Sequence, residues 1–293
     1  MKRLIRPIHI AGANGFPISL YRPLMDHLSE QIRIRQPSVP STEARTLIAG
    51  SDVYGHISDF PDWTGMVNHV ISDIEKRKVG AVTAVGHSLG GALMGCAASQ
   101  RPDLFHKLII IDSPFFCLPK RLFWAFLLLL PEATVRTHHP IIKAAAKKPS
   151  HWNSKAEAQA YFKSKKVFQR FSPEVLDIFL EECLVSSATG HTTLQFPVED
   201  ECDIYYKASI ELKFHWRKYF GMHDFPQNAE FFYSKDYHIV NAMDIMWMKH
   251  FDNPNITFRH YEGSHFWPFD NPGDCAATIS QVMFDDNRGL LLS

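Results

Sequence analysis

The sequence of 293 residues predicts an α/β protein: a doubly wound, mostly parallel sheet with a helical cap inserted after the strand that ends near Asp112. Three observations lead to this prediction. Short apolar runs alternate with stretches of helical period, which is typical of parallel sheets wound with helices. Several of these runs lack polar alternation, as do strands that helices cover on both faces. The strand rhythm then stops between residues 115 and 225, a stretch too long for a simple crossover.

The N-terminal part contains the best-defined strands and helices. An apolar run at residues 8–11 predicts a strand that enters a glycine-rich loop at residues 12–17. Leu20, Leu24 and Leu28 follow at spacing four and predict a helix. Further strands are expected at 81–85 and 108–111, and 32–35 is a candidate short strand. Helices are expected at 63–76 and 89–100, and most of 37–61 is expected to be loop.

The same alternation returns near the C-terminus. Strands are expected at 230–233 and 256–261, and helices at 238–250 and 274–284. This pattern divides the chain into a core domain of residues 1–114 and 226–293 and a helical cap, or lid, of residues 115–225. In open α/β sheets, ligands bind at the carboxyl ends of the strands, so we expect the cap to cover that edge.

Composition excludes several classes of protein. Lys plus Arg and Asp plus Glu both number 31, so the formal net charge is zero, and a protein built mainly to bind nucleic acid is not expected. Five cysteines without C-x-x-C spacing argue against a disulfide framework or a zinc knuckle and favour a reducing compartment. No apolar run reaches the ~20 residues that span a bilayer, so we predict a soluble cytoplasmic protein.

The longest apolar run, residues 122–130, has two interpretations. It follows Lys120 and Arg121, and it could form an interfacial lid helix for lipid substrates. It is apolar all round, which favours a buried helix instead. The sequence therefore favours burial, and membrane contact is not expected.

The motif Gly86-His87-Ser88-Leu89-Gly90 is the sharpest chemical signal in the chain. It follows a predicted strand and opens a predicted helix, the context in which G-x-S-x-G presents a nucleophilic serine. The glycines, together with the small residues that follow, allow the sharp turn and the close approach of the helix to the sheet. Ser88 is therefore the candidate nucleophile.

A serine hydroxyl needs a base and, behind it, a carboxylate. His265 follows the last predicted strand and is the candidate base. Asp236, after the strand at 230–233, is the favoured carboxylate because this motif class has the chain order Ser, Asp, His. Asp112, which ends the strand at 108–111, is the alternative acid. The backbone N–H groups of Leu89 and Asn14 are the candidate oxyanion-hole donors.

These motifs resemble those of the α/β-hydrolase superfamily in its capped, esterase-like branch. Residues 86–91 look like its nucleophile elbow, 233–239 like its acid turn, 263–268 like its histidine turn and 12–17 like its oxyanion loop. Tyr233 replaces the usual glycine of the acid turn, and Gly12-Ala13 stands where His-Gly is common. The resemblance covers about residues 8–114 and 226–285, and it implies the fold and a Ser-His-Asp triad.

The predicted function is hydrolysis of an acyl ester through an acyl-enzyme intermediate, with a small-molecule substrate that has an apolar portion. No cofactor and no metal are expected. A thioesterase, an amidase or a C–C bond hydrolase with the same triad is an alternative, as is a non-catalytic binding protein on this fold. Basic residues near the cap that could meet an anionic substrate are Lys143, Lys147, Lys148, Lys163, Lys165 and Lys166, although a solvated helix face is the favoured interpretation. The natural substrate and the oligomeric state stay open.

Overall fold

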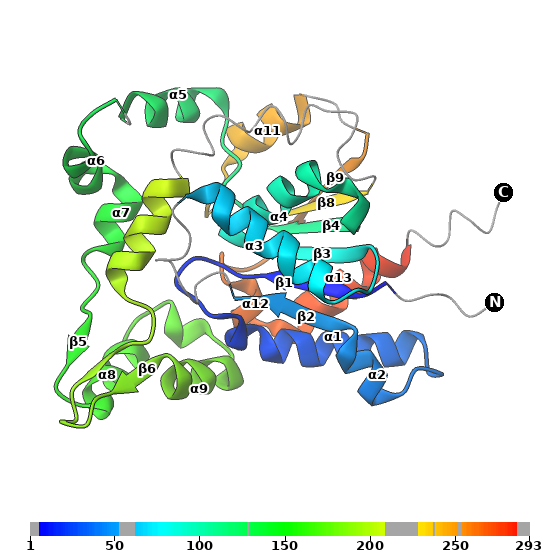
Figure 1. Cartoon of the computed structure of the whole chain (residues 1–293), viewed down its shortest axis with the longest axis horizontal. Coiled ribbons are helices and arrows are strands. Elements are labelled where there is room, and N and C mark those ends of the chain that lie inside the picture. The colour runs from blue at the N-terminus through cyan, green and yellow to red at the C-terminus, as the bar shows by residue number, and fades with distance from the viewer. Residues whose placement is uncertain are drawn as a thin grey trace.

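A six-stranded sheet, in which all paired strands run parallel, forms the centre of the molecule (Figure 1). The computed structural model describes residues 6–52, 62–127, 129–208, 228–236, 238–250 and 254–285. The strand order is β2-β1-β3-β4-β8-β9. The strands are β1 (Ile8–Ala11), β2 (Ile48–Ser51), β3 (Val82–His87), β4 (Phe105–Ile111), β8 (Ala229–Ser234) and β9 (Ile256–Tyr261). The order reverses between β1 and β3, which places the ligand crevice of this topology at their carboxyl ends.

Helices cover both faces of the sheet, as predicted. One face packs against α1 (Arg22–Arg35), α12 (Trp267–Asp270) and α13 (Pro272–Asp285), and the other against α3 (Trp63–Lys76), α4 (Leu89–Gln100) and α11 (Ala242–His250) (Figure 1). Strand β4 shows the reason. Leu108 and Ile110 belong to one buried cluster, while Ile109 and Ile111 belong to the other. A strand with two apolar faces needs a helical layer on each.

The segment between β4 and β8 lies over the carboxyl edge of the sheet and is not purely helical. It contains α5 (Leu118–Leu127), α6 (Glu132–His138), α7 (Pro140–Ala145), α8 (Lys155–Lys163), α9 (Pro173–Glu182) and a helical stretch at residues 198–208. It also forms a small antiparallel sheet of β5 (His151–Trp152), β7 (Thr192–Leu194) and β6 (Leu184–Ser186). Strands this short carry no alternation that a sequence pattern could detect.

The candidate strand at residues 32–35 was wrong. These residues form the last turn of α1, where Ile32 is buried and the Arg35 guanidinium donates to Ser280 Oγ of α13 at 2.8 Å. The second strand is β2, from Ile48 to Ser51, within the stretch expected to be mostly loop. It is a half-buried edge strand with a glycine in it, so its sequence lacks a strand signature.

The expectation of a buried helix at residues 122–130 was also wrong. Leu122 and Phe126 of α5 are 60% and 63% exposed, and Leu129 beyond the helix is exposed as well. The apolar side of this helix faces outward. Among the described residues, none of the helices is both long enough and apolar enough to cross a bilayer.

Candidate active site

Ser88 lies on a strained turn between β3 and α4. Its backbone angles are φ 55° and ψ −121°, in a region that non-glycine residues seldom adopt. The turn tolerates no side chain at its flanking glycines. A Cβ on Gly86 would lie 2.4 Å from the Gly91 Cα, and one on Gly90 would lie 2.2 Å from the Ala11 carbonyl oxygen. The hydroxyl is therefore held outside the sheet at the carboxyl end of β3, where G-x-S-x-G turns present their serine.

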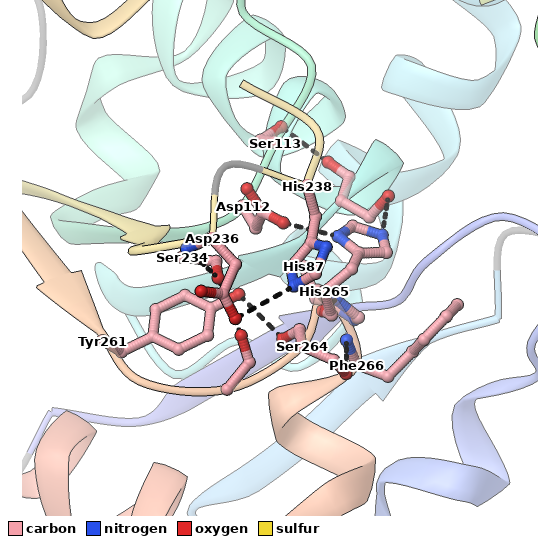
Figure 2. A network of polar contacts seen from close by, with 12 residues as sticks. His87, Asp112, Ser113, Ser234, Asp236, His238, Tyr261, Ser264, His265 and Phe266 are labelled. Atoms are coloured by element: carbon pink, nitrogen blue, oxygen red, sulfur yellow. Dashed lines mark hydrogen bonds and ion pairs between the residues drawn. The ribbon is translucent and has the colours of Figure 1, made fainter. Parts of the chain in front are cut away.

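The structure brings Ser88 and His265 together with Asp112. His265 Nε2 lies 3.0 Å from Ser88 Oγ, and His265 Nδ1 lies 2.8 Å from Asp112 Oδ2 (Figure 2). Asp112 is fully buried, and its φ of 40° bends the chain sharply where β4 ends. Its amide donates to the Phe232 carbonyl at 2.8 Å, which fixes this bend against the neighbouring strand β8.

Asp236, the carboxylate favoured from the sequence, does not contact His265 among the hydrogen bonds and ion pairs of the described residues. Its side chain is 71% exposed and lies 3.9 Å from His238 Nε2. The physical reason is the turn after β8, where Ser234 Oγ accepts from the Asp236 amide and donates to the Gly263 carbonyl. That turn fixes the backbone of Asp236 (Figure 2), and its carboxylate is left largely exposed to solvent.

The loop that carries His265 is held at several points. Tyr261 Oη donates to the Ser264 carbonyl at 3.1 Å, and Ser264 Oγ donates to Asp270 Oδ2 at 2.5 Å. Ser264 Oγ also accepts from the Phe266 amide at 3.0 Å. These contacts lie on both sides of His265 and fix the direction of its imidazole.

A buried bridge, which we call the Tyr21–His87 bridge, joins three segments of the site and was missed from the sequence. Tyr21 Oη accepts from the Ala13 amide at 2.8 Å and donates to His87 Nδ1 at 2.6 Å. His87 Nε2 then donates to the His265 carbonyl at 2.8 Å. Burial lowers the pKa of His87 well below its usual value near 6.5, and the nearby charge of His265 adds to this effect. A neutral His87 with its proton on Nε2 satisfies both bonds.

The sequence gives one weak sign of this bridge. His87 is the variable position of the G-x-S-x-G motif, directly before Ser88. Tyr21 carries no sign, because its contact with His87 spans 66 positions of the chain.

The two candidate oxyanion donors both line the cavity beside Ser88. Leu89 begins α4, so its N–H is one of those that a helix leaves without an intrahelical acceptor. Asn14 lies in the loop after β1, and the Gly90 amide ties that loop to the elbow by donating to the Gly12 carbonyl at 3.0 Å. Asn14 Nδ2 donates to the Glu201 carbonyl at 3.1 Å, so the inserted segment holds this loop in place.

A cavity of about 620 Å³ opens at Ser88 and His265 under the inserted segment. Phenylalanines from both parts of the chain form much of its wall: Phe16, Phe115, Phe116, Phe162, Phe168, Phe179, Phe196 and Phe266. Its polar wall includes Glu201, whose two carboxylate oxygens accept from Lys148 Nζ at 2.7 and 2.8 Å. The volume falls within the range of small-molecule sites, and an apolar wall with few polar groups is typical of them.

Two of the six cap lysines line this cavity, Lys148 and Lys165. Lys148 pairs with Glu201, and the Lys165 ammonium lies 4.1 Å from the Tyr161 ring centroid. The other four are exposed. Within the described ranges, no group of His, Cys, Asp and Glu side chains is arranged to hold a metal ion.

No protein-family model and no curated protein sequence matches the chain, but solved structures match its fold. A peroxisomal α/β-hydrolase from Saccharomyces cerevisiae superposes with a TM-score of 0.65 at 12% identity, over 95% of this chain and 76% of its own. The thioesterase domain from the curacin biosynthetic pathway gives 0.61 at 13% identity, over 95% and 91%. A marine microorganism esterase gives 0.57 at 16% identity, over 96% of both chains.

These similarities confirm the predicted fold class. The chain has the α/β-hydrolase fold, with a parallel sheet of six strands and an insertion that is mostly helical. At such identities the comparisons concern the fold, and the chemistry has to be argued from the site itself.

Proposed function

We propose that this protein is a serine hydrolase that cleaves acyl esters. Ser88 is the nucleophile, His265 the general base and then acid, and Asp112 the carboxylate that orients the imidazole. The observation that carries the proposal is the hydrogen-bonded series from Ser88 Oγ through His265 to Asp112. This series ends in a large apolar cavity, so the nucleophile faces a space that a substrate can fill.

Each group has a defined part in the reaction. Ser88 Oγ attacks the ester carbonyl carbon while His265 Nε2 takes its proton, and the Asp112 carboxylate stabilises the imidazolium through Nδ1–H. The amides of Leu89 and Asn14 bind the oxyanion of the tetrahedral intermediate. His265 gives its proton to the leaving alcohol, which leaves an acyl-enzyme. Water, deprotonated by His265, attacks the acyl carbon, and Ser88 departs with its proton restored.

The cavity supports a substrate with an apolar portion. Its phenylalanines come from the core and from the inserted segment alike, so a chain or ring bound there is removed from water on both sides. The Lys148–Glu201 pair neutralises the charges at one part of the wall, where an uncharged group fits best.

The decisive experiment is hydrolysis of p-nitrophenyl esters from acetate to palmitate by the wild type and by Ser88→Ala. We expect the wild type to prefer chains longer than acetate and the variant to lose at least 10³-fold in kcat/KM. Circular dichroism of the variant is the control for folding. Unchanged hydrolysis by Ser88→Ala would refute the assignment.

The bond type is tested in the same assay. Thioesters, anilides and β-diketones presented beside the esters distinguish an esterase from a thioesterase, an amidase or a C–C hydrolase with the same triad. A fluorophosphonate probe separates all of these from a non-catalytic binding protein. Labelling that requires Ser88 supports an activated nucleophile, and a failure to label this serine would favour the binding protein.

A further inference from the structure

Two helices joined by a buried aspartate, α5 and α11, each carry exposed apolar side chains, and we call this set the α5–α11 face. Its members are Leu118, Leu122, Phe123 and Phe126 of α5 and Met243 and Met246 of α11, all of them exposed. Asp244 of α11 joins the two helices: it accepts from the amide of Cys117, just before α5, at 2.8 Å and pairs with Lys120 at 2.5 Å. An apolar surface of this kind marks a site of association.

The orientation of α5 is the reverse of what a surface helix in water adopts. A helix normally turns its apolar side inward and its charges outward. Here Lys120 reaches inward to Asp244, which is fully buried, and the Arg121 guanidinium lies 5.8 Å from the Trp247 ring centroid. Leu122 and Phe126 therefore point outward, and the Asp244 contacts prevent the helix from rolling to bury them.

The charge on this face identifies the chemistry of its partner. Residues 113–131 contain no Asp or Glu, and the acidic residue of α11, Asp244, is buried. Lys120 is neutralised by its inward pair with Asp244, so the outward basic groups are Lys249 and His250 at the exposed end of α11. The face thus combines outward apolar side chains with basic groups, the composition of helices that lie on bilayers with anionic lipids.

The face also borders the cavity that contains Ser88. Arg121 of α5, Phe116 just before that helix and Ile239 just before α11 all line the cavity wall. An apolar molecule held in the leaflet that contacts this face could pass beside α5 without crossing water. A second copy of the chain would also cover the apolar side chains, but two copies would bring the basic groups of both faces together.

We propose that the α5–α11 face binds the surface of bilayers that contain anionic lipids. Leu122, Phe123, Phe126 and Met246 insert at the level of the headgroups, and Lys249 and His250 at the exposed end of α11 lie against the lipid phosphates. The interaction is peripheral, since α5 has 10 residues and spans about 15 Å. This proposal does not depend on the proposed hydrolysis.

The test is flotation of the full chain, carrying Ser88→Ala so that no lipid is cleaved, with vesicles of phosphatidylcholine alone or with one-third phosphatidylserine. We expect binding to the anionic vesicles, weaker binding at high salt, and a loss of at least tenfold in Leu122→Glu/Phe126→Glu. Ile34→Glu/Val185→Glu changes two exposed apolar residues outside this face and should bind like the parent.

Several results would overturn the proposal. One is the absence of binding to anionic vesicles by the parent protein, and another is equal binding by Leu122→Glu/Phe126→Glu. If the parent protein dimerises in light scattering, does not bind vesicles, and loses dimerisation in this double variant, the face belongs to a second copy instead. Two controls separate misfolding from loss of membrane binding: circular dichroism of the double variant, and hydrolysis of a soluble ester by the same double variant with Ser88 retained.

Discussion

At the scale of single residues, backbone geometry determines which aspartate lies against His265. Asp112 and Asp236 follow the neighbouring strands β4 and β8, so both reach the same edge of the sheet. The φ of 40° at Asp112 directs its carboxylate to His265, whereas the Ser234 turn leaves Asp236 in solvent. Chain order alone does not encode this difference.

The two aspartates form a matched pair of variants. We expect Asp112→Asn to lower kcat by about 10⁴-fold, because an amide no longer stabilises the imidazolium or its productive tautomer. Asp236→Asn should stay within about twofold of wild type, since its carboxylate is exposed. Ester hydrolysis with purified variants measures both. The opposite pattern would restore Asp236 as the acid.

The Tyr21–His87 bridge makes a separate prediction. Tyr21→Phe leaves the Ala13 amide and His87 Nδ1 without their partner, which should lower stability by about 2 kcal/mol. Because the bridge also fixes the loop of Asn14 and the backbone of His265, we expect kcat to fall roughly tenfold with little change in KM. Urea unfolding and steady-state kinetics measure the two effects. Reduced stability with wild-type kcat would limit Tyr21 to packing.

At this scale the sequence predicted part of the arrangement that the structure shows. It indicated Ser88 through its motif and His265 through its place after the last strand, and the structure brings the two within 3.0 Å. It favoured Asp236 over Asp112 as the carboxylate, whereas the structure places Asp112 against His265, and it did not reveal the Tyr21–His87 bridge. Both depend on tertiary contacts over more than 60 positions, which a single sequence does not express.

At the scale of elements, strong periodicity was reliable and weak patterns were not. The helices α3 and α4 have the predicted bounds, because their apolar period and flanking turns agree. Strand β2 was missed, since an edge strand with small residues lacks an apolar run. A buried helix was expected at residues 122–130, whereas α5 runs from Leu118 to Leu127 and is exposed, because composition does not tell which side of a helix faces the protein.

Two glycines of α4 test how tightly this helix approaches the sheet. In Gly90→Ala the Cβ would lie 2.2 Å from the Ala11 carbonyl oxygen, so the helix has to move. We expect the free energy of unfolding to fall by about 3 kcal/mol or more, the upper end of the usual cost of overpacking. In Gly95→Ala the nearest atom, in the Phe115 ring, is 3.7 Å from the new Cβ. The higher helix propensity of alanine should raise the free energy of unfolding by about 0.5–1 kcal/mol. Chemical denaturation compares them. Equal stability of the two variants would contradict the close approach.

At the scale of the whole molecule, three buried histidines link the fold to pH. Burial lowers the pKa of His9 and of His139 to about 4, with a contribution from Arg77 at His9, and it lowers the pKa of His87 further below 6.5. The folded state therefore binds fewer protons than the unfolded chain between about pH 4 and 6.5. The contribution of these neutral histidines to stability is fully present above pH 6.5 and is lost as the pH falls through this window.

His9 isolates one part of this effect. Its Nε2 donates to Ser51 Oγ at 2.8 Å, and Ser51 Oγ donates to Asp73 at 3.0 Å, so the neutral ring fits the chain of bonds and a protonated ring adds a buried charge. A single group of this kind contributes up to about 1.4 kcal/mol per pH unit to the slope. His9→Gln keeps a hydrogen-bond donor but has no titrating ring. It should reduce the slope of unfolding free energy against pH by up to this contribution between pH 4 and 6.5. His151→Gln, at an exposed position, should leave the slope unchanged. Urea unfolding at intervals of half a pH unit gives the slopes, and parallel curves for wild type and His9→Gln would show that His9 is not held neutral by the fold.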